Sequence, residues 1–152
     1  LIDALREHIP DIAITTDIIV GFPGESDEDF AETLDMVKRV GFEGAFTFIY
    51  SPRSGTPASK YEDDLPAGVK KQRLQELNKL VNEGYLNGNK RFEGKTAKVL
   101  VDGPSGKNAN MLTGYSEHNK LVNFPGEKIL TGEIVDVKIE KAYTWHLRGI
   151  IE

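Results

Sequence analysis

The stretch GFPGESDEDF, residues 21–30, constrains the fold of this chain more than any other, because it joins an apolar run directly to a helix start. The preceding run IAITTDIIV, residues 12–20, is β-branched and nearly continuously apolar, which predicts a strand buried on both faces. Ser26 is expected to be the N-cap of the helix, with Asp29 completing a capping box. Gly41 stands where a C-terminal cap belongs.

A second strand and a long helix are predicted downstream. AFTFIY, residues 45–50, continues the pattern, and strand, helix and strand with short links predict a βαβ unit with parallel strands. A long helix is expected from Pro66 to about residue 92. Its inner face should carry Val69, Leu74, Leu77, Val81 and Tyr85.

From Lys95 onward the hydrophobic period shortens to that of strands. Five short strands, separated by Gly, Asn and Pro, occupy about 60 residues and predict a small closed, OB-like β-barrel. The segment GPSGKNAN, residues 103–110, interrupts the alternation. We therefore expect two domains, residues 1–88 of α/β type and residues 89–152 of β type.

Composition narrows the class of protein. A hydrophobic content of 39% and a charged content of 28% are typical of a soluble globular protein, and no apolar run approaches the ~20 residues of a membrane span. The sequence has no cysteine, which excludes thiolate metal sites within these residues. Because the chain starts at Leu1 in helical sequence, we expect a fragment of a longer protein.

Two loops follow strand ends and are candidates for ligand contact. GFPGE lacks the Lys-Ser/Thr pair of a P-loop, and acids crowd the helix start, so the loop favours a neutral or cationic ligand over a phosphate. A plain strand–helix turn is the alternative. In YSPRSGTPAS, Arg53 can fork onto a carboxylate or phosphate, or is a surface arginine.

Several segments together resemble one family. DIIVGFPGESDEDF, FIYSPRSGTPA, VKKQRLQEL, VLVDGPSG, LTGYSEHNKLVNFPG and TGEIVDVKIEKAYTWHLRG occur in the order seen in radical-SAM methylthiotransferases, especially the tRNA 2-methylthioadenosine synthases. The resemblance implies that residues 1–88 are the C-terminal part of a partial (β/α) radical-SAM barrel and residues 89–152 a TRAM domain. It further implies a cytoplasmic enzyme that adds a methylthio group to C2 of a modified adenosine next to the anticodon.

The resemblance also implies cofactors. The full-length enzymes use S-adenosylmethionine and two [4Fe-4S] clusters, and the cationic sulfonium agrees with a loop that does not favour phosphate. The expected cofactor-binding residues are Gly21, Phe22, Pro23, Gly24, Glu25 and Arg53. Because the cluster-binding cysteines are absent, we expect this fragment to bind no cluster or metal and to be catalytically inactive alone.

The barrel is expected to bind the tRNA anticodon arm. Phosphate contacts are predicted for Lys107, Lys120 and Arg148, and base stacking for Tyr115 and Trp145, although aromatic residues there can also serve packing. His8, His118 and His146 are too scattered to be metal ligands.

Other interpretations remain open. A threonylcarbamoyl-adenosine tRNA methylthiotransferase or a ribosomal-protein methylthiotransferase would share this architecture. A non-catalytic module binding protein or oligosaccharide is also possible, because residues 81–152 carry 10 basic and 9 acidic residues, against 9 and 15 in residues 1–80.

Overall fold

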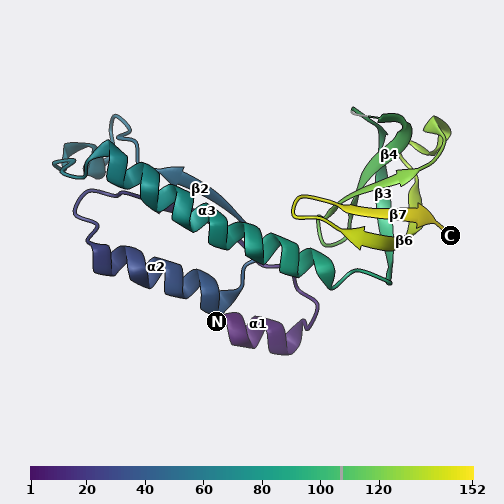
Figure 1. Ribbon diagram of the computed structural model, residues 1–152, viewed down its shortest axis with the longest axis horizontal. Coiled ribbons are helices and arrows are strands. Elements are labelled where there is room, and N and C mark those ends of the chain that lie inside the picture. Colours follow the sequence, from purple (N-terminus) through teal and green to yellow (C-terminus); the bar gives the residue numbers. More distant parts are fainter. Residues whose placement is uncertain (107) are drawn as a thin grey trace. The chain divides into compact units, whose positions relative to one another are not determined.

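The computed structural model describes residues 1–106 and 108–152, which fold as two compact units (Figure 1). The βαβ unit comprises Ile14–Gly84, and the barrel unit comprises Asp3–Ala13 with Tyr85–Glu152. The long helix α3 (Ala67–Lys90) contributes residues to both units. A domain boundary between residues 88 and 89 stays a prediction.

The βαβ unit contains two parallel strands joined by a helix, as predicted. β1 (Thr15–Val20) pairs with β2 (Gly44–Ile49) in parallel, and α2 (Asp27–Val40) connects them. The 3₁₀ helix η1 (Pro57–Lys60) precedes α3, and α1 (Ile2–His8) opens the chain. β1 begins three residues later than the apolar run that predicted it.

The predicted caps of α2 are confirmed. The Ser26 hydroxyl accepts the Asp29 N–H at 3.1 Å, and the Asp29 carboxylate accepts the Ser26 N–H at 2.9 Å. At the other end Gly41 has φ 59°, and its N–H donates to the Val37 carbonyl at 2.9 Å. Local sequence therefore sets both ends of this helix.

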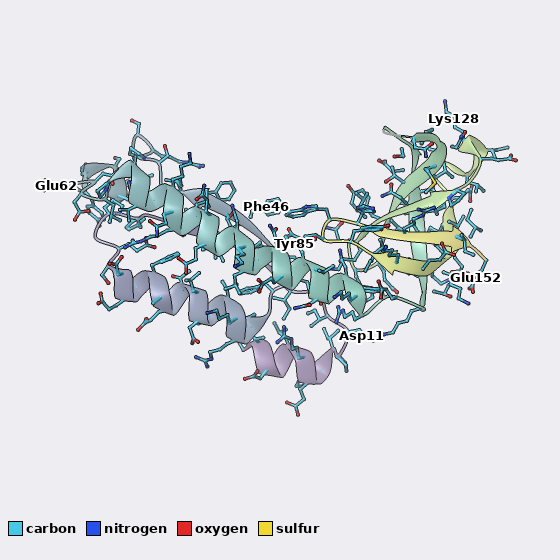
Figure 2. The ribbon with its side chains drawn as sticks, viewed as in Figure 1. Asp11, Phe46, Glu62, Tyr85, Lys128 and Glu152 are labelled. Carbon is cyan, nitrogen blue, oxygen red and sulfur yellow. The ribbon has the colours of Figure 1, made fainter. Side chains whose placement is uncertain are left out.

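The prediction that β1 is buried on both faces is wrong. The helices cover one face, where the core contains Val20, Phe30, Val37, Val40, Ala45, Leu77 and Val81. On the other face Ile19 is 53% exposed and Phe48 51%, and Phe46, 67% exposed, is labelled on β2 in Figure 2. The reason is that, in the described part of the chain, β1 and β2 form a sheet of only two strands.

The inner face of α3 also differs from the prediction. Its buried stripe runs through Lys70, Arg73, Leu77 and Val81, whereas Val69 and Leu74 are only half-buried. The prediction counted only apolar residues as inward-facing. Lys70 and Arg73 are buried instead because they pair with Asp63 and Glu25 of the neighbouring loops.

The barrel unit holds the predicted five-stranded closed barrel, in the strand order β3-β4-β5-β7-β6. Its strands are β3 (Thr96–Ser105), β4 (Asn108–Ser116), β5 (Leu121–Pro125), β6 (Ile134–Ala142) and β7 (Leu147–Ile151), and the 3₁₀ helix η2 (Lys128–Leu130) precedes β6. β3 continues to Ser105 and β4 begins at Asn108, so both strands extend into the segment where the alternation was predicted to break, and their pairing there has register shifts.

The barrel interior is closely packed. Val99, Val122, Phe124, Val137 and Leu147 are fully buried in one apolar cluster. Gly114 faces this interior, and a Cβ there would lie 2.3 Å from the Leu100 carbonyl oxygen. Only glycine fits where β3 and β4 approach this closely.

Candidate functional site

An open pocket of about 620 Å³ lies at the carboxyl ends of β1 and β2. Ligands of parallel α/β sheets bind at this end of the strands. Phe22 and Arg53, from two separate loops, both line the pocket. The other predicted cofactor residues, namely Gly21, Pro23, Gly24 and Glu25, are not among its lining residues.

Aromatic rings form one wall of the pocket. The Phe22 ring packs edge-on against Tyr50, with ring centroids 5.0 Å apart, and against Tyr61 at 6.3 Å. The Tyr50 hydroxyl donates a hydrogen bond to the Ala58 carbonyl at 2.9 Å. These contacts hold rigid apolar faces at the pocket, suited to the flat ring of a ligand.

Charged groups of both signs also line the pocket. Asp17 and Arg53 are exposed there, together with Ser51 and Thr56. The Arg53 carbonyl accepts hydrogen bonds from the Thr56 N–H at 3.2 Å and from its hydroxyl at 2.8 Å. A ligand carrying an aromatic ring, a cation and a carboxylate matches this lining.

Glu25 is engaged within the protein. Its carboxylate accepts the Gly21 N–H at 2.7 Å and an Arg73 guanidinium N–H at 2.6 Å. A second nitrogen of Arg73 donates to Asp27 at 2.6 Å. Burial opposes the charge of Arg73, but its hydrogen bonds to Asp27 and Glu25 outweigh burial and raise the pKa of Arg73. Glu25 therefore shapes the loop rather than lining the pocket.

Lys70 and Arg73 were missed from the sequence. They lie three residues apart and continue the spacing of Leu77 and Val81, which is the signal that places them on the inner face. The acidic residues of the GFPGE helix start were the second signal, because buried cations require anionic partners.

The outer face of the barrel brings Tyr115 and Arg148 onto one surface. Tyr115 is 47% exposed on β4 and lies opposite Leu121 of β5. Two residues further along β5, Asn123 lies opposite Arg148 of β7, which is also exposed. We call Tyr115, Leu121, Asn123 and Arg148, with Thr113 opposite Asn123, the β4–β5–β7 face.

The remaining predicted RNA contacts lie elsewhere. Trp145, in the β6–β7 turn, is 60% exposed and packs against Tyr85 with ring centroids 5.0 Å apart. Lys120 is only 7% exposed, and this burial weighs against its predicted phosphate contact. Lys107 lies outside the described residues.

His118 and His146 pack against different aromatic rings. His118 packs on Phe92 at 5.1 Å and His146 stacks on Tyr143 at 4.6 Å. Across residues 1–106 and 108–152 the structure has no group of three or more His, Asp or Glu side chains that could hold a metal ion. In the same ranges, every helix is too short or too polar to cross a membrane.

Comparison with known families finds a match for the barrel. Residues 90–151 match the TRAM domain family. All five strands of the barrel lie within the matched residues. Residues 90–151 carry ten Lys and Arg and seven Asp and Glu, a small basic excess.

The chain as a whole is similar to curated proteins named tRNA-2-methylthio-N(6)-dimethylallyladenosine synthase. It is 55% identical over 149 residues to the protein of Bacillus mycoides (strain KBAB4) and 54% identical to that of Bacillus cereus (strain B4264). Each alignment covers 98% of this chain but only 29% of the relative, so the chain spans less than a third of these proteins. The resemblance to methylthiotransferases inferred from the sequence is confirmed.

Proposed function

We propose that this chain is the C-terminal portion of a tRNA methylthiotransferase that adds a methylthio group to C2 of a modified adenosine next to the anticodon. The observation that carries the proposal is the identity of 55% across 98% of the chain. Because the relatives carry the dimethylallyladenosine name, they favour this substrate over a threonylcarbamoyl-adenosine or a ribosomal protein.

The βαβ unit would then be part of the radical-SAM barrel. Its pocket at the carboxyl ends of β1 and β2 fits S-adenosylmethionine by the chemistry of its lining. Phe22 would contact the adenine ring, Arg53 the carboxylate, and Asp17 a cationic group. S-adenosylmethionine and the iron–sulfur clusters would supply the radical chemistry, with cluster ligands from outside this cysteine-free chain.

The exposed apolar face of β1 and β2 supports the same proposal. Ile19, Phe46 and Phe48 lie on the side of the sheet opposite the helices, which is the interior side of a β/α barrel. Further strands of the longer protein would close the barrel over this face, and the pocket would then open toward its interior.

The TRAM domain would bind the anticodon arm through the β4–β5–β7 face. Tyr115 offers a ring for an unstacked base, Asn123 and Thr113 offer hydrogen-bonding groups, and Arg148 offers a charge for phosphate. In OB-type barrels the corresponding strands bind oligonucleotides, which by analogy favours this face.

The test uses the longer protein that contains this chain, with its clusters reconstituted anaerobically. Incubation with S-adenosylmethionine, a reductant, a sulfide source and tRNA bearing dimethylallyladenosine should produce the methylthio nucleoside, detected by mass spectrometry of digested tRNA. Arg53→Ala should raise the KM for S-adenosylmethionine, whereas Ser54→Ala, its neighbour outside the pocket, should not. A cluster-loaded enzyme that leaves this tRNA unmodified would refute the proposed substrate.

A further inference from the structure

Two buried cations of α3, Lys70 and Arg73, contact the GFPGE loop. Lys70 is 6% exposed and Arg73 is 5% exposed, and they lie three residues apart on the same side of the helix. Burying a charge is costly unless it is fully paired, so each of these cations requires anionic partners. Neither side chain lines the pocket that holds Phe22 and Arg53.

Arg73 donates three hydrogen bonds, two to Glu25 of the loop and one to Asp27 in α2. One guanidinium nitrogen donates to the Glu25 carbonyl at 3.0 Å and to the Glu25 carboxylate at 2.6 Å. The other donates to Asp27 at 2.6 Å, in the first turn of α2. Because the same Glu25 oxygen also accepts the Gly21 N–H, the guanidinium fixes both ends of the five-residue loop.

Lys70 holds the beginning of the loop. Its aliphatic stem lies so close to Gly21 that a Cβ at that position would be 2.6 Å from the Lys70 Cγ. Gly21 has φ 71°, a conformation that favours glycine. The Lys70 ammonium pairs with Asp63 and lies 5.8 Å from the Tyr50 ring centroid.

Phe22 is flanked by the residues that Lys70 and Arg73 contact. Phe22 lies between Gly21 and Glu25, the two residues that α3 holds, and its carbonyl accepts the Glu25 N–H at 2.9 Å. Its ring contacts Tyr50, over which the Lys70 ammonium lies. Lys70 and Arg73 thus contact the residues next to the aromatic wall, although neither of them lines the pocket.

We infer that Arg73, assisted by Lys70, is a positioning residue that holds the GFPGE loop so that Phe22 forms the wall of the S-adenosylmethionine pocket. This inference rests on the proposed function, since it names S-adenosylmethionine as the ligand. An arginine is required because its planar fork serves Glu25 and Asp27 at once, which a lysine ammonium cannot do in the same geometry.

The experiment compares Arg73→Met and Arg73→Lys with wild type in the cluster-reconstituted longer protein. Equilibrium dialysis measures the Kd for S-adenosylmethionine, steady-state kinetics give KM for each substrate, and hydrogen exchange reports on the peptide spanning residues 18–30. Arg39→Met is the matched control, because Arg39, on α2, makes an exposed 3.8 Å ion pair with Asp35 one turn earlier on the same helix.

For Arg73→Met we expect the Kd and KM for S-adenosylmethionine to rise about tenfold, the loss expected when charge-assisted hydrogen bonds are removed. The KM for tRNA should stay within about twofold, and exchange in residues 18–30 should accelerate. Arg73→Lys should fall between Arg73→Met and wild type, and Arg39→Met should match wild type.

A folded Arg73→Met enzyme with an unchanged Kd for S-adenosylmethionine would overturn the inference and leave Arg73 a purely structural residue. If Arg73→Met does not fold, Asp27→Asn removes the negative charge of one of the two anionic partners of Arg73, on a side chain that is 91% exposed. Asp27→Asn should raise the Kd about two- to threefold, and no change there also overturns the inference. A wild-type enzyme that binds no S-adenosylmethionine would instead refute the proposed function itself.

Discussion

Replacing Tyr115 with alanine should weaken RNA binding by the barrel while leaving its salt dependence unchanged. Tyr115 is 47% exposed, and its neighbours across the strands are Leu100 and Leu121, so the ring lies on an apolar surface that a base can cover. Base–aromatic stacking contributes about 1–3 kcal/mol per base, so the affinity should fall about 5- to 150-fold. The ring carries no charge, and the number of phosphates neutralised should therefore not change.

Arg148→Ala should give the opposite pattern on the same face. Loss of one phosphate contact should reduce the log–log salt slope by about 0.7 for single-stranded RNA, with only a moderate loss of affinity. Lys98→Ala is the matched control, because the Lys98 ammonium already pairs with Asp136 at 3.1 Å and both are exposed. It should leave both the affinity and the salt slope close to wild type.

The assay is fluorescence anisotropy of a labelled anticodon stem-loop titrated with the 152-residue chain at several salt concentrations between about 50 and 200 mM. Wild-type Kd should lie in the range of weak, charge-driven contacts, about 10⁻⁴ to 10⁻⁶ M. Tyr115→Phe should retain most of the affinity, since the ring remains. Unchanged affinity in Tyr115→Ala would refute the assignment of this face, and no RNA binding at low salt would favour a protein- or oligosaccharide-binding module.

Three further predictions concern stability and metal content. Leu147→Ala, at a fully buried core position of the barrel, should destabilise that unit by about 2–5 kcal/mol in urea unfolding, whereas Ile150→Ala, 43% exposed on the same strand, should cost much less. The Ser26 backbone and side chain, by hydrogen bonding, hold the pKa of Asp29 below its ordinary value, so the stabilisation is present above about pH 4 and is lost as the pH falls through the folded-state pKa. The Tm difference between wild type and Asp29→Asn should therefore shrink in acid, and a constant difference would contradict this. Anaerobic reconstitution of the 152-residue chain should yield no stoichiometric iron or sulfide, because the chain has no cysteine.

The sequence alone determined the features that depend on neighbours a few residues apart. The capping box follows from the three-residue spacing of Ser26 and Asp29, and the C-cap follows from the single glycine at position 41. The five barrel strands follow from alternation of apolar and polar side chains, a pattern that each strand carries by itself. The order of six short segments was also enough to place the chain beside the methylthiotransferases.

Which side chains meet depends on the tertiary structure. Arg73 reaches Glu25 across 48 residues of sequence, and although its spacing from Leu77 and Val81 places it on the inner face of α3, that spacing does not name its partner. Tyr115 and Arg148 share a face only because the register of β4, β5 and β7 sets Leu121 and Asn123 between them. Lys120 looked like a loop cation in the sequence but is buried, since side-chain exposure depends on the packing of distant strands rather than on residue type.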